Sequence, residues 1–311
     1  MEDKLVSVII PTYNRAEMLR EAIKSVLCQT YDNFELLILD NCSPDHTPDV
    51  VALFSDSRIK YVRHQCNIGA MANWTYGVQW AQGKYLSILG DDDKYFPQFI
   101  QRRVNAMSKI PNAVAAFGQF DVLNVIDGSN GTIKLSYYES DNDSVVLYGK
   151  DALKASLDCQ FVGASLYKSD IFRDCWNQNV IWNKCTDELI NIKMAISTHN
   201  CLIYLNESDM QYRRHAMQDS YADGYMVAEH GRFIYEYLIA QCIDIEYKKL
   251  IKAKLIVHLN RNGKWLHEAG HYKKSTNYFF QELKYNPLNI KTIARILRSF
   301  YFQFKSPKIC Y

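Results

Sequence analysis

The sequence lacks the features that define several common protein classes. Its 9 cysteines are scattered, and no two of them form a Cys-x-x-Cys pair. We therefore expect neither a disulfide framework nor a zinc site, and we expect most thiols to be reduced in a reducing cytosol. No Gly-x-Gly-x-x-Gly follows a predicted strand and no P-loop is present, which argues against NAD-dependent oxidoreduction and against P-loop chemistry.

Long apolar segments and a strong charge imbalance are also missing. No run approaches the roughly 20 apolar residues that span a bilayer, and the apolar stretch near the N-terminus is too short for a signal peptide. The formal net charge of +2 and the pI near 8.0 do not favour a nucleic-acid binder. We expect a protein that is soluble or at most rests on a membrane surface.

What the sequence does contain is a regular alternation of strands and helices over its first hundred residues. Apolar runs at 5–10, 34–40 and 85–89 predict buried strands, the first of which is expected to stop at Pro11. Apolar residues between 15 and 29 recur at helical spacing. This alternation predicts right-handed βαβ units and a mostly parallel sheet covered on both faces.

Ligands bind such sheets at the carboxyl ends of the strands, and four polar loops fall there: PTYNR, DNCSPD, HQCNIG and GDDD. The last loop places Asp91, Asp92 and Asp93 side by side after a buried strand. Adjacent carboxylates repel, and near a low-dielectric core they need protons or a cation. Three acids in this context make a plain acidic turn the poorer interpretation.

The rest of the chain is less regular. We predict a hairpin at 128–140, short helices at 150–157 and 171–176, a strong helix at 185–197 and a strand at 201–206. From about Tyr221 the pattern is helical and rich in Lys, Arg, Tyr and Phe, with Pro287 expected to open the last helix. The predicted domains are therefore an α/β domain over 1–220 and an all-helical extension over 221–311.

Together these motifs resemble the inverting glycosyltransferases of family 2. The resemblance is carried by VSVIIPTYNR, VLCQT, DNCS, NIGAMANW and GDDDKYFP in this order, and later by TDELINIKMA and YRRHAMQDS, so that it covers about residues 5 to 220. It implies the GT-A fold, a Rossmann-like α/β domain. Residues 1–110 would form its nucleotide-binding half and residues 111–220 its acceptor-binding half.

The resemblance implies a set of nucleotide contacts: Pro11, Thr12, Tyr13, Arg15, Asp40, Asn67, Gly69 and Asp91. Asp40 would accept the imide proton of uracil or thymine, which disfavours a purine; the alternative is a turn residue. Arg15 either approaches the diphosphate or is a solvated arginine of the first helical turn. Gly69 would permit close backbone approach, and Asn73 would support that loop.

A divalent cation, Mn²⁺ or Mg²⁺, is also implied. Such an ion acts as a Lewis acid on the leaving diphosphate and is held by only one or two carboxylates. Asp92 is the first choice for the ligand, with Asp93 as a second ligand or its support. By the same resemblance His215 would ligate the cation or contact the diphosphate, and Arg213 or Arg214 would neutralise phosphate.

Direct displacement needs a base for the acceptor hydroxyl. The resemblance puts this base at Asp187, with Glu188 as the alternate, although Thr186 stands where many family members have Glu. The alternative is that both acids only complement the dipole of a helix N-terminus.

The resemblance predicts a metal-dependent inverting glycosyltransferase that uses a UDP-sugar, or a dTDP-sugar, on a glycan or lipid-linked acceptor in surface polysaccharide synthesis. A non-catalytic nucleotide-sugar-binding protein of the same fold is the alternative. A sugar-nucleotide pyrophosphorylase ranks lower because PTYNRAEML has no glycine. The basic, aromatic C-terminal helices predict a helical cap or, as a second hypothesis, peripheral contact with the inner face of the cell membrane.

Overall fold

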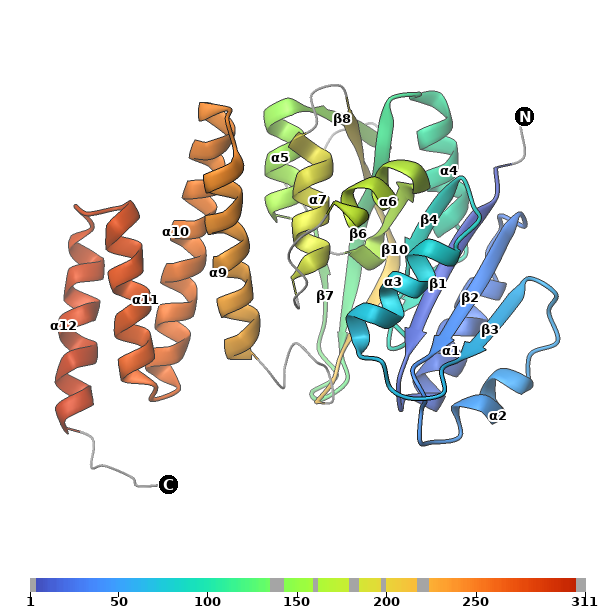
Figure 1. Ribbon diagram of the computed structural model, residues 1–311, viewed down its shortest axis with the longest axis horizontal. Helices are drawn as coiled ribbons and strands as arrows, with labels where there is room; N and C mark the ends of the chain where they lie inside the picture. Colours follow the sequence, from blue (N-terminus) through green and yellow to red (C-terminus); the bar gives the residue numbers. More distant parts are fainter. Residues whose placement is uncertain are drawn as a thin grey trace. The chain divides into compact units, whose positions relative to one another are not determined.

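The computed structural model describes residues 4–134, 143–158, 162–178, 185–196, 200–216 and 224–305 of the 311-residue chain. The chain forms two compact units, Met1–Ala222 and Asp223–Tyr311. The first unit mixes strands and helices, and the described part of the second is helical (Figure 1).

The α/β unit begins with the predicted alternation of strands and helices. Its helices are α1 (Ala16–Leu27), α2 (Thr47–Ala52), α3 (Ala70–Trp80), α4 (Phe99–Lys109), α5 (Gly149–Asp158), α6 (Ser169–Asn177) and α7 (Thr186–Ile196). Its strands are β1 (Val6–Thr12), β2 (Phe34–Asp40), β3 (Ile59–Arg63), β4 (Tyr85–Ile88), β5 (Lys94–Tyr95), β6 (Ala113–Asn124), β7 (Asn130–Ile133), β8 (Ser144–Tyr148), β9 (Ser165–Lys168) and β10 (Cys201–Arg214).

One sheet runs through this unit in the order β3-β2-β1-β4-β9-β6-β10-β5, with β7 beside β6 and β8 beside β10. β1 pairs in parallel with β2 and β4, β2 with β3, and β6 with β10, whereas β9 is antiparallel to both β4 and β6. Consequently β1, β2, β3, β4, β6 and β10 all point the same way. Their carboxyl ends meet at one edge of the sheet, where a ligand is expected.

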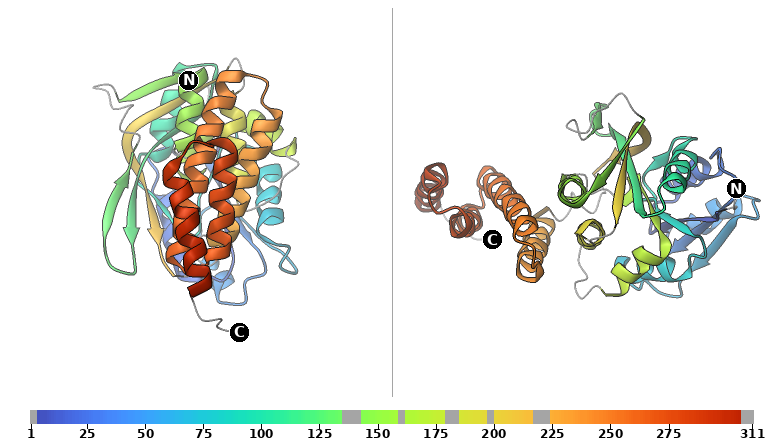
Figure 2. Two further views of the ribbon diagram at one scale, coloured as in Figure 1. Left: turned by 90° about the vertical axis from the view of Figure 1, so that its left-hand side faces the viewer. Right: turned by 90° about the horizontal axis from the view of Figure 1, so that it is seen from above.

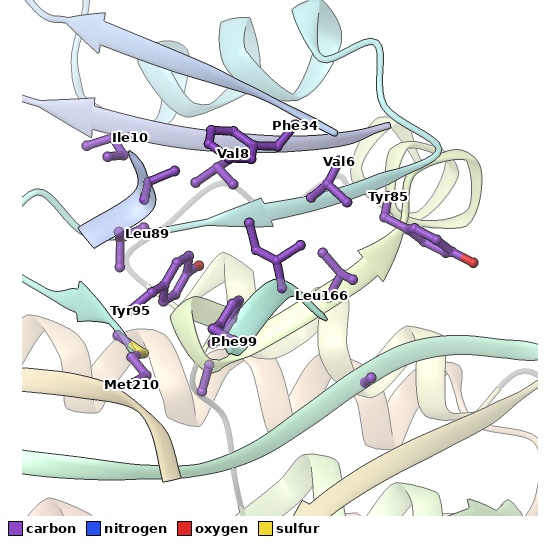
Figure 3. Close-up of a cluster of buried hydrophobic side chains, with 14 of the residues drawn as sticks. Val6, Val8, Ile10, Phe34, Tyr85, Leu89, Tyr95, Phe99, Leu166 and Met210 are labelled. Atoms are coloured by element: carbon purple, nitrogen blue, oxygen red, sulfur yellow. The ribbon is translucent and has the colours of Figure 1, made fainter. Parts of the chain in front are cut away.

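Helices cover both faces of the sheet (Figure 2). α1 and α4 pack on one face, and α3, α5, α6 and α7 pack on the other. Figure 3 shows the first of these layers, with Val8 and Phe34 from the parallel strands and the rings of Tyr95 and Phe99 in one apolar cluster. The two rings are stacked. The strand β1 is apolar on both faces because both are buried, as predicted for a central parallel strand.

Two strands are longer than predicted. β1 continues through Pro11 to Thr12, so the prediction that Pro11 stops the strand is wrong. The proline is tolerated because β4 has already ended there: the β1–β4 register stops at Ile9 opposite Ile88, and only β2 continues alongside. β10 continues past Asn206 to Arg214 and pairs with β6 along this length, with irregularities in the register. Its other side pairs first with β8 and then, at Met210 and Gln211, with β5.

The helical unit contains α9 (Gly224–Gln241), α10 (Ile245–Glu268), α11 (Tyr272–Tyr285) and α12 (Ile290–Lys305). Neighbouring helices in sequence pack against each other, and Gly263 of α10 lies close against α11. A Cβ atom there would lie 2.6 Å from the ring of Phe279. Ser275 then reaches the Gly263 carbonyl with its hydroxyl at 2.7 Å.

Pro287 does not open the last helix. It lies in the connection 286–289, and α12 begins at Ile290. Asn289 holds the first turn instead, because its backbone carbonyl accepts from the Thr292 amide at 3.0 Å. Among the described residues no helix is long and apolar enough to cross a membrane. The seven cysteines of the described ranges are free; Cys159 and Cys310 lie outside those ranges.

Candidate active site

The aspartate loop, residues Asp91–Asp93, lies at the carboxyl edge of the sheet, as predicted. It follows β4 and is tied back to the end of β10 by the short strand β5, in which Tyr95 pairs with Met210. This pairing brings together two segments more than a hundred residues apart in sequence. The three aspartates thereby meet Arg213 and His215.

Asp91 is buried at the end of β1. Its side chain accepts a hydrogen bond from the Thr12 hydroxyl at 2.8 Å and one from Arg15 at 2.9 Å. Burial raises its pKa to about 6, Arg15 opposes the rise, and the neighbouring Asp92 adds to it. Arg15 immediately precedes α1, and its Nη1 also lies 3.5 Å from Asp92 Oδ2. It is therefore not the solvated first-turn arginine of the second interpretation.

Asp92 is the more accessible carboxylate, with 12% of its side chain exposed against 3% for Asp91. Its Oδ2 lies 3.0 Å from Nε2 of His215, which is buried. The other ring nitrogen of His215, Nδ1, is also buried and finds no hydrogen-bond partner among the described residues. His215 thus lies next to the carboxylate that the sequence proposes as the cation ligand.

Asp93 and Arg213 hold the loop in shape. The Arg213 amide donates to Asp93 Oδ1 at 2.9 Å, and its guanidinium donates to the Asp92 carbonyl and to Glu21 of α1. Burial, followed by repulsion from Asp92, raises the pKa of Asp93 well above its usual range. In the structure Arg213 braces the aspartate loop, while Arg214 is exposed.

Gly90 is required by this crowding. A Cβ atom at this position would lie 2.7 Å from Asp92 Oδ1 and 3.0 Å from Asp93 Oδ2. The side chain is excluded by the carboxylates and not by the backbone conformation, since Gly90 has no positive φ.

The donors around Asp92 fit a divalent cation of the Mn²⁺ or Mg²⁺ type. Carboxylate oxygen and imidazole nitrogen together suit Mn²⁺, and oxygen suits Mg²⁺. Burial, and then repulsion from Asp92, raise the pKa values of Asp91 and Asp93. In the described ranges no group of three acids, histidines or cysteines has metal-binding geometry. A cation would therefore rest on Asp92 with His215 and on oxygens of the substrate.

The nucleotide side of the edge is formed by β2 and the loops that follow β2 and β3. Asp40, at the end of β2, is fully buried. Its Oδ1 accepts from the Ser43 amide and its Oδ2 from the Tyr61 hydroxyl, both at 2.7 Å. The turn role left open from the sequence is present, because the Ser43 contact closes the turn after the strand.

An amide network links the loops after β2 and β3. Asn41 donates to Asn67 at 2.9 Å and accepts from the Ile68 amide, and Asn67 also accepts from the Gly69 amide. Gly69 has φ 85°, which explains the glycine, and no atom lies within 4 Å of its missing Cβ. The structure therefore explains Gly69 by its backbone conformation, without a crowded approach. Asn73 supports the loop, as predicted, by donating to the Leu39 carbonyl.

The remaining predicted contacts lie at the end of β1. Pro11 is half-buried, Thr12 is buried against Asp91, and the Tyr13 ring is 45% exposed. Tyr13 is thus available at the surface of this edge.

Asp187 and Glu188 begin α7 and are half-buried. Burial raises the pKa of Asp187 to about 6. Asp187 in turn adds to the rise that burial causes in the pKa of Tyr167. Among the described residues no hydrogen bond or ion pair joins Asp187 to the aspartate loop, so the predicted base and the predicted metal site are separate groups.

Four residues of the site were not predicted: Glu21, Asn41, Ser43 and Tyr61. Asn41 and Ser43 belong to the DNCS motif and were within reach of sequence reasoning. Glu21 and Tyr61 meet Arg213 and Asp40 across 192 and 21 residues, and nothing local in the sequence marks them.

Comparison with known proteins finds similar sequences and similar folds. The profile of the family described as Glycosyl transferase family 2 matches residues 7–176. A curated relative in Escherichia coli, UDP-Glc:alpha-D-GlcNAc-diphosphoundecaprenol beta-1,3-glucosyltransferase WfgD, is 36% identical over 124 residues, which are 40% of this chain and 49% of the relative. The first curated relatives are matched over 16% to 49% of their own length.

Solved structures resemble a larger part of the chain. S. aureus TarS 1-349 in complex with UDP-GlcNAc has a TM-score of 0.66 at 17% identity, covering 96% of this chain and 87% of that one. The mannosyltransferase PcManGT from Pyrobaculum calidifontis, in complex with GDP-Man and Mn²⁺, has a TM-score of 0.58 at 16% identity, covering 96% and 84%. At these identities the likeness establishes the fold.

Proposed function

The chain belongs to glycosyl transferase family 2 and its α/β unit has the predicted GT-A fold, and on this premise we propose that it transfers a sugar from a nucleotide-diphospho-sugar to a hydroxyl group. The acceptor is a glycan or a lipid-linked saccharide. The reaction proceeds with inversion at the anomeric carbon. Residues 1–110 bind the donor, residues 111–220 bind the acceptor, and the helical unit is an extension.

One observation carries the proposal: Asp92 and His215 form a close pair at the carboxyl edge, and the aspartates on either side of Asp92 are buried and have raised pKa values. Such a site has more negative charge than its neighbours neutralise. It favours a ligand that brings positive charge, and a metal-bound diphosphate does so.

Different residues of the site would bind the cation and the diphosphate. Asp92 and His215 would hold Mn²⁺ or Mg²⁺, which neutralises charge on the leaving diphosphate. Arg15 now pairs with Asp91 and Asp92, and it is close enough to exchange these carboxylates for a phosphate oxygen. Arg213 and Asp93 stabilise the aspartate loop, and the exposed Arg214 would contact phosphate.

Asp187 is the proposed base, with Glu188 as the alternate. A carboxyl with a pKa of about 6 is ionised near neutral pH yet retains more basicity than an ordinary aspartate. It accepts the proton of the acceptor hydroxyl as that oxygen attacks the anomeric carbon from the side opposite the diphosphate. The glycosidic bond forms, the bond to the diphosphate breaks, and the configuration inverts.

The donor is proposed to be a UDP-sugar, with a dTDP-sugar as the alternative. Two similar proteins support this choice. The curated relative is named for UDP-Glc, and the similar TarS structure is a complex with UDP-GlcNAc. The base would lie by Pro11, Tyr13 and the Asp40 turn, the ribose by Asp91, and Asn67 and Gly69 would border the donor.

The acceptor is proposed from the same relative, whose name specifies a sugar on diphosphoundecaprenol. A second relative is named a putative colanic acid biosynthesis glycosyl transferase. A cytoplasmic enzyme of surface polysaccharide synthesis, working where lipid-linked acceptors are exposed, fits both names.

Calorimetric titration tests the donor site. UDP, dTDP and GDP are titrated with and without Mn²⁺ into the wild-type chain, Asp92→Asn and the control Asp32→Asn, whose side chain is 96% exposed. We expect UDP binding that needs Mn²⁺, loses at least about tenfold in Asp92→Asn, as for a metal-site residue, and is unchanged in Asp32→Asn.

The outcomes separate the parts of the proposal. A preference for GDP would overturn the choice of donor, and metal-independent binding would overturn the role of Asp92. Binding of UDP-sugars with no transfer to any acceptor and no release of UDP would favour the non-catalytic binder. The absence of nucleotide binding would overturn the proposal as a whole.

A further inference from the structure

α12 exposes apolar side chains, where an ordinary surface helix exposes polar ones. A helix that packs on a core places apolar side chains inward and polar ones outward. In α12 the outward row consists of Ile290, Ile293, Leu297 and Tyr301, which are 79%, 42%, 66% and 54% exposed. At 3.6 residues per turn these four residues form one continuous stripe along the helix.

The buried face of α12 contains small polar residues, and near its C-terminal end the rings of Phe300 and Phe302 also contact α10 and α11. Thr292 and Ser299 are fully buried, and Ile296 is the buried apolar residue between them. Thr292 donates to Glu282 at 2.7 Å, and the Ser299 hydroxyl lies 2.8 Å from His267 Nδ1. Hydrogen bonds of this kind fix the helix in one rotation. The apolar stripe is therefore held outward by the packing of the unit.

Basic residues line one border of this stripe. The helical period places Lys291, Arg295 and Arg298 on the same side of the apolar row, and α12 contains no acidic residue. Across residues 269–305 seven Lys and Arg stand against one acid, a net charge of +6, whereas the whole chain carries +2. The single acid, Glu282, is fully buried. The segment that contains α11 and α12 is thus more basic than the chain as a whole.

We propose that the exposed stripe of α12, with its basic border, docks the protein on an anionic lipid bilayer. An apolar row flanked by Lys and Arg matches a surface whose acyl chains lie beneath negative headgroups. A second copy of the chain fits less well, because a twofold contact would bring two such basic borders together. Docking is independent of the proposed sugar transfer and is measured without donor or acceptor.

The test is flotation of the full chain with lipid vesicles. One set of vesicles is phosphatidylcholine, and the other is an equimolar mixture of phosphatidylcholine and phosphatidylglycerol. We expect binding to the mixed vesicles and little to phosphatidylcholine. Binding weakens as salt rises from about 0.1 M to about 1 M, since the screening length falls from roughly 10 Å to 3 Å.

Two double variants separate the apolar and charged contributions. Ile293→Gln with Leu297→Gln is expected to lower vesicle binding at least about tenfold, since two apolar side chains no longer enter the interface. Lys291→Gln with Arg298→Gln is expected to lower it roughly fivefold for each charge removed. The matched control is Ile243→Gln: Ile243 is 95% exposed in the same unit but off α12, and its substitution should change nothing.

All substituted side chains are exposed, so urea unfolding of each variant should match the wild type. Absence of wild-type binding to anionic vesicles would overturn the proposal. Binding that both double variants leave unchanged would do the same. A wild-type dimer in sedimentation velocity that the Ile293/Leu297 variant abolishes, without lipid binding, would assign the stripe to a second copy.

Discussion

Buried aspartates occur at two places in the α/β unit, at Asp209 and in the aspartate loop, and their surroundings differ. Asp209, in β10, is 1% exposed, and its carboxylate accepts hydrogen bonds from Arg102 and Arg103. Arg103 is itself fully buried and also reaches the Ala164 carbonyl. In the aspartate loop, by contrast, Arg15 lies against Asp91 and Asp92, and His215 lies against Asp92. Asp93 accepts from the backbone amide of Arg213, whose side chain donates to Glu21 and a backbone carbonyl.

The difference separates a structural acid from a functional one. At Asp209 the positive charge matches the negative charge within the protein, so nothing further is needed. At Asp91 and Asp93 it does not, and burial and like charge raise both pKa values. A buried acid is a poor guide to function by itself; a buried acid whose charge the protein leaves unbalanced is a better one.

The largest expected effect is that of a substitution at Asp209. Asp209→Asn should lower the free energy of unfolding by about 3–5 kcal/mol, because a buried ion pair that loses one partner leaves Arg103 uncompensated. Urea unfolding followed by circular dichroism measures this, with Asp32→Asn as the exposed control. A change below about 1 kcal/mol would mean that Arg103 is well solvated or re-paired.

Asp187 gives a pH-dependent contrast. Its folded pKa of about 6 lies above the ordinary 3.8, so the protonated form is favoured in the folded state. The stability it contributes is fully present below pH 3.8 and is lost as pH rises through about 6. Asp187→Asn should therefore be more stable than the wild type at pH 7, by up to about 3 kcal/mol, and equal to it near pH 4.

Urea unfolding at both pH values checks this sign. Equal stability of variant and wild type at pH 7 would show that Asp187 is solvated. If Asp187 is also the base, the same variant should lower the rate of transfer by roughly 10²–10⁴.

His215 tests whether the open pair is a binding site. His215→Ala should weaken Mn²⁺-dependent UDP binding about 10- to 100-fold, the range for groups that hold or orient a metal. Calorimetry measures it. His215→Gln, which keeps a donor near Asp92, should recover part of the loss, whereas equal binding in all three proteins would make His215 structural.

The smallest expected effect is on stability at Asp92. Asp92→Asn should change the free energy of unfolding by less than about 1 kcal/mol, since the carboxylate is repelled by Asp91 and Asp93 as well as attracted by Arg15, and the substitution removes both effects. This variant and Asp209→Asn thus form a matched pair. A loss at Asp92 as large as at Asp209 would erase the distinction between the two groups.

The sequence predicted the parts of the fold that repeat locally. The burial of 34–40 on both faces, the helical spacing in α1 and the apolar run before Asp91 follow from residues close together in the chain. The predictions that Pro11 ends β1 and that Pro287 begins the last helix were wrong. Proline has no backbone N–H to donate, and whether that donor is needed depends on the neighbouring strand or turn.

The sequence by itself determined the order of strands and helices in the first hundred residues, the family motifs and the place of the aspartates after a buried strand. The tertiary structure decided which charges meet. Arg213 and His215 reach Asp92 and Asp93 across more than a hundred residues, and the inward hydrogen bonds of Thr292 and Ser299 turn the apolar row of α12 outward. The physical reason is that periodicity reports a side chain's face, whereas its partner and its pKa depend on distances that exist only after the sheet and the helices have packed.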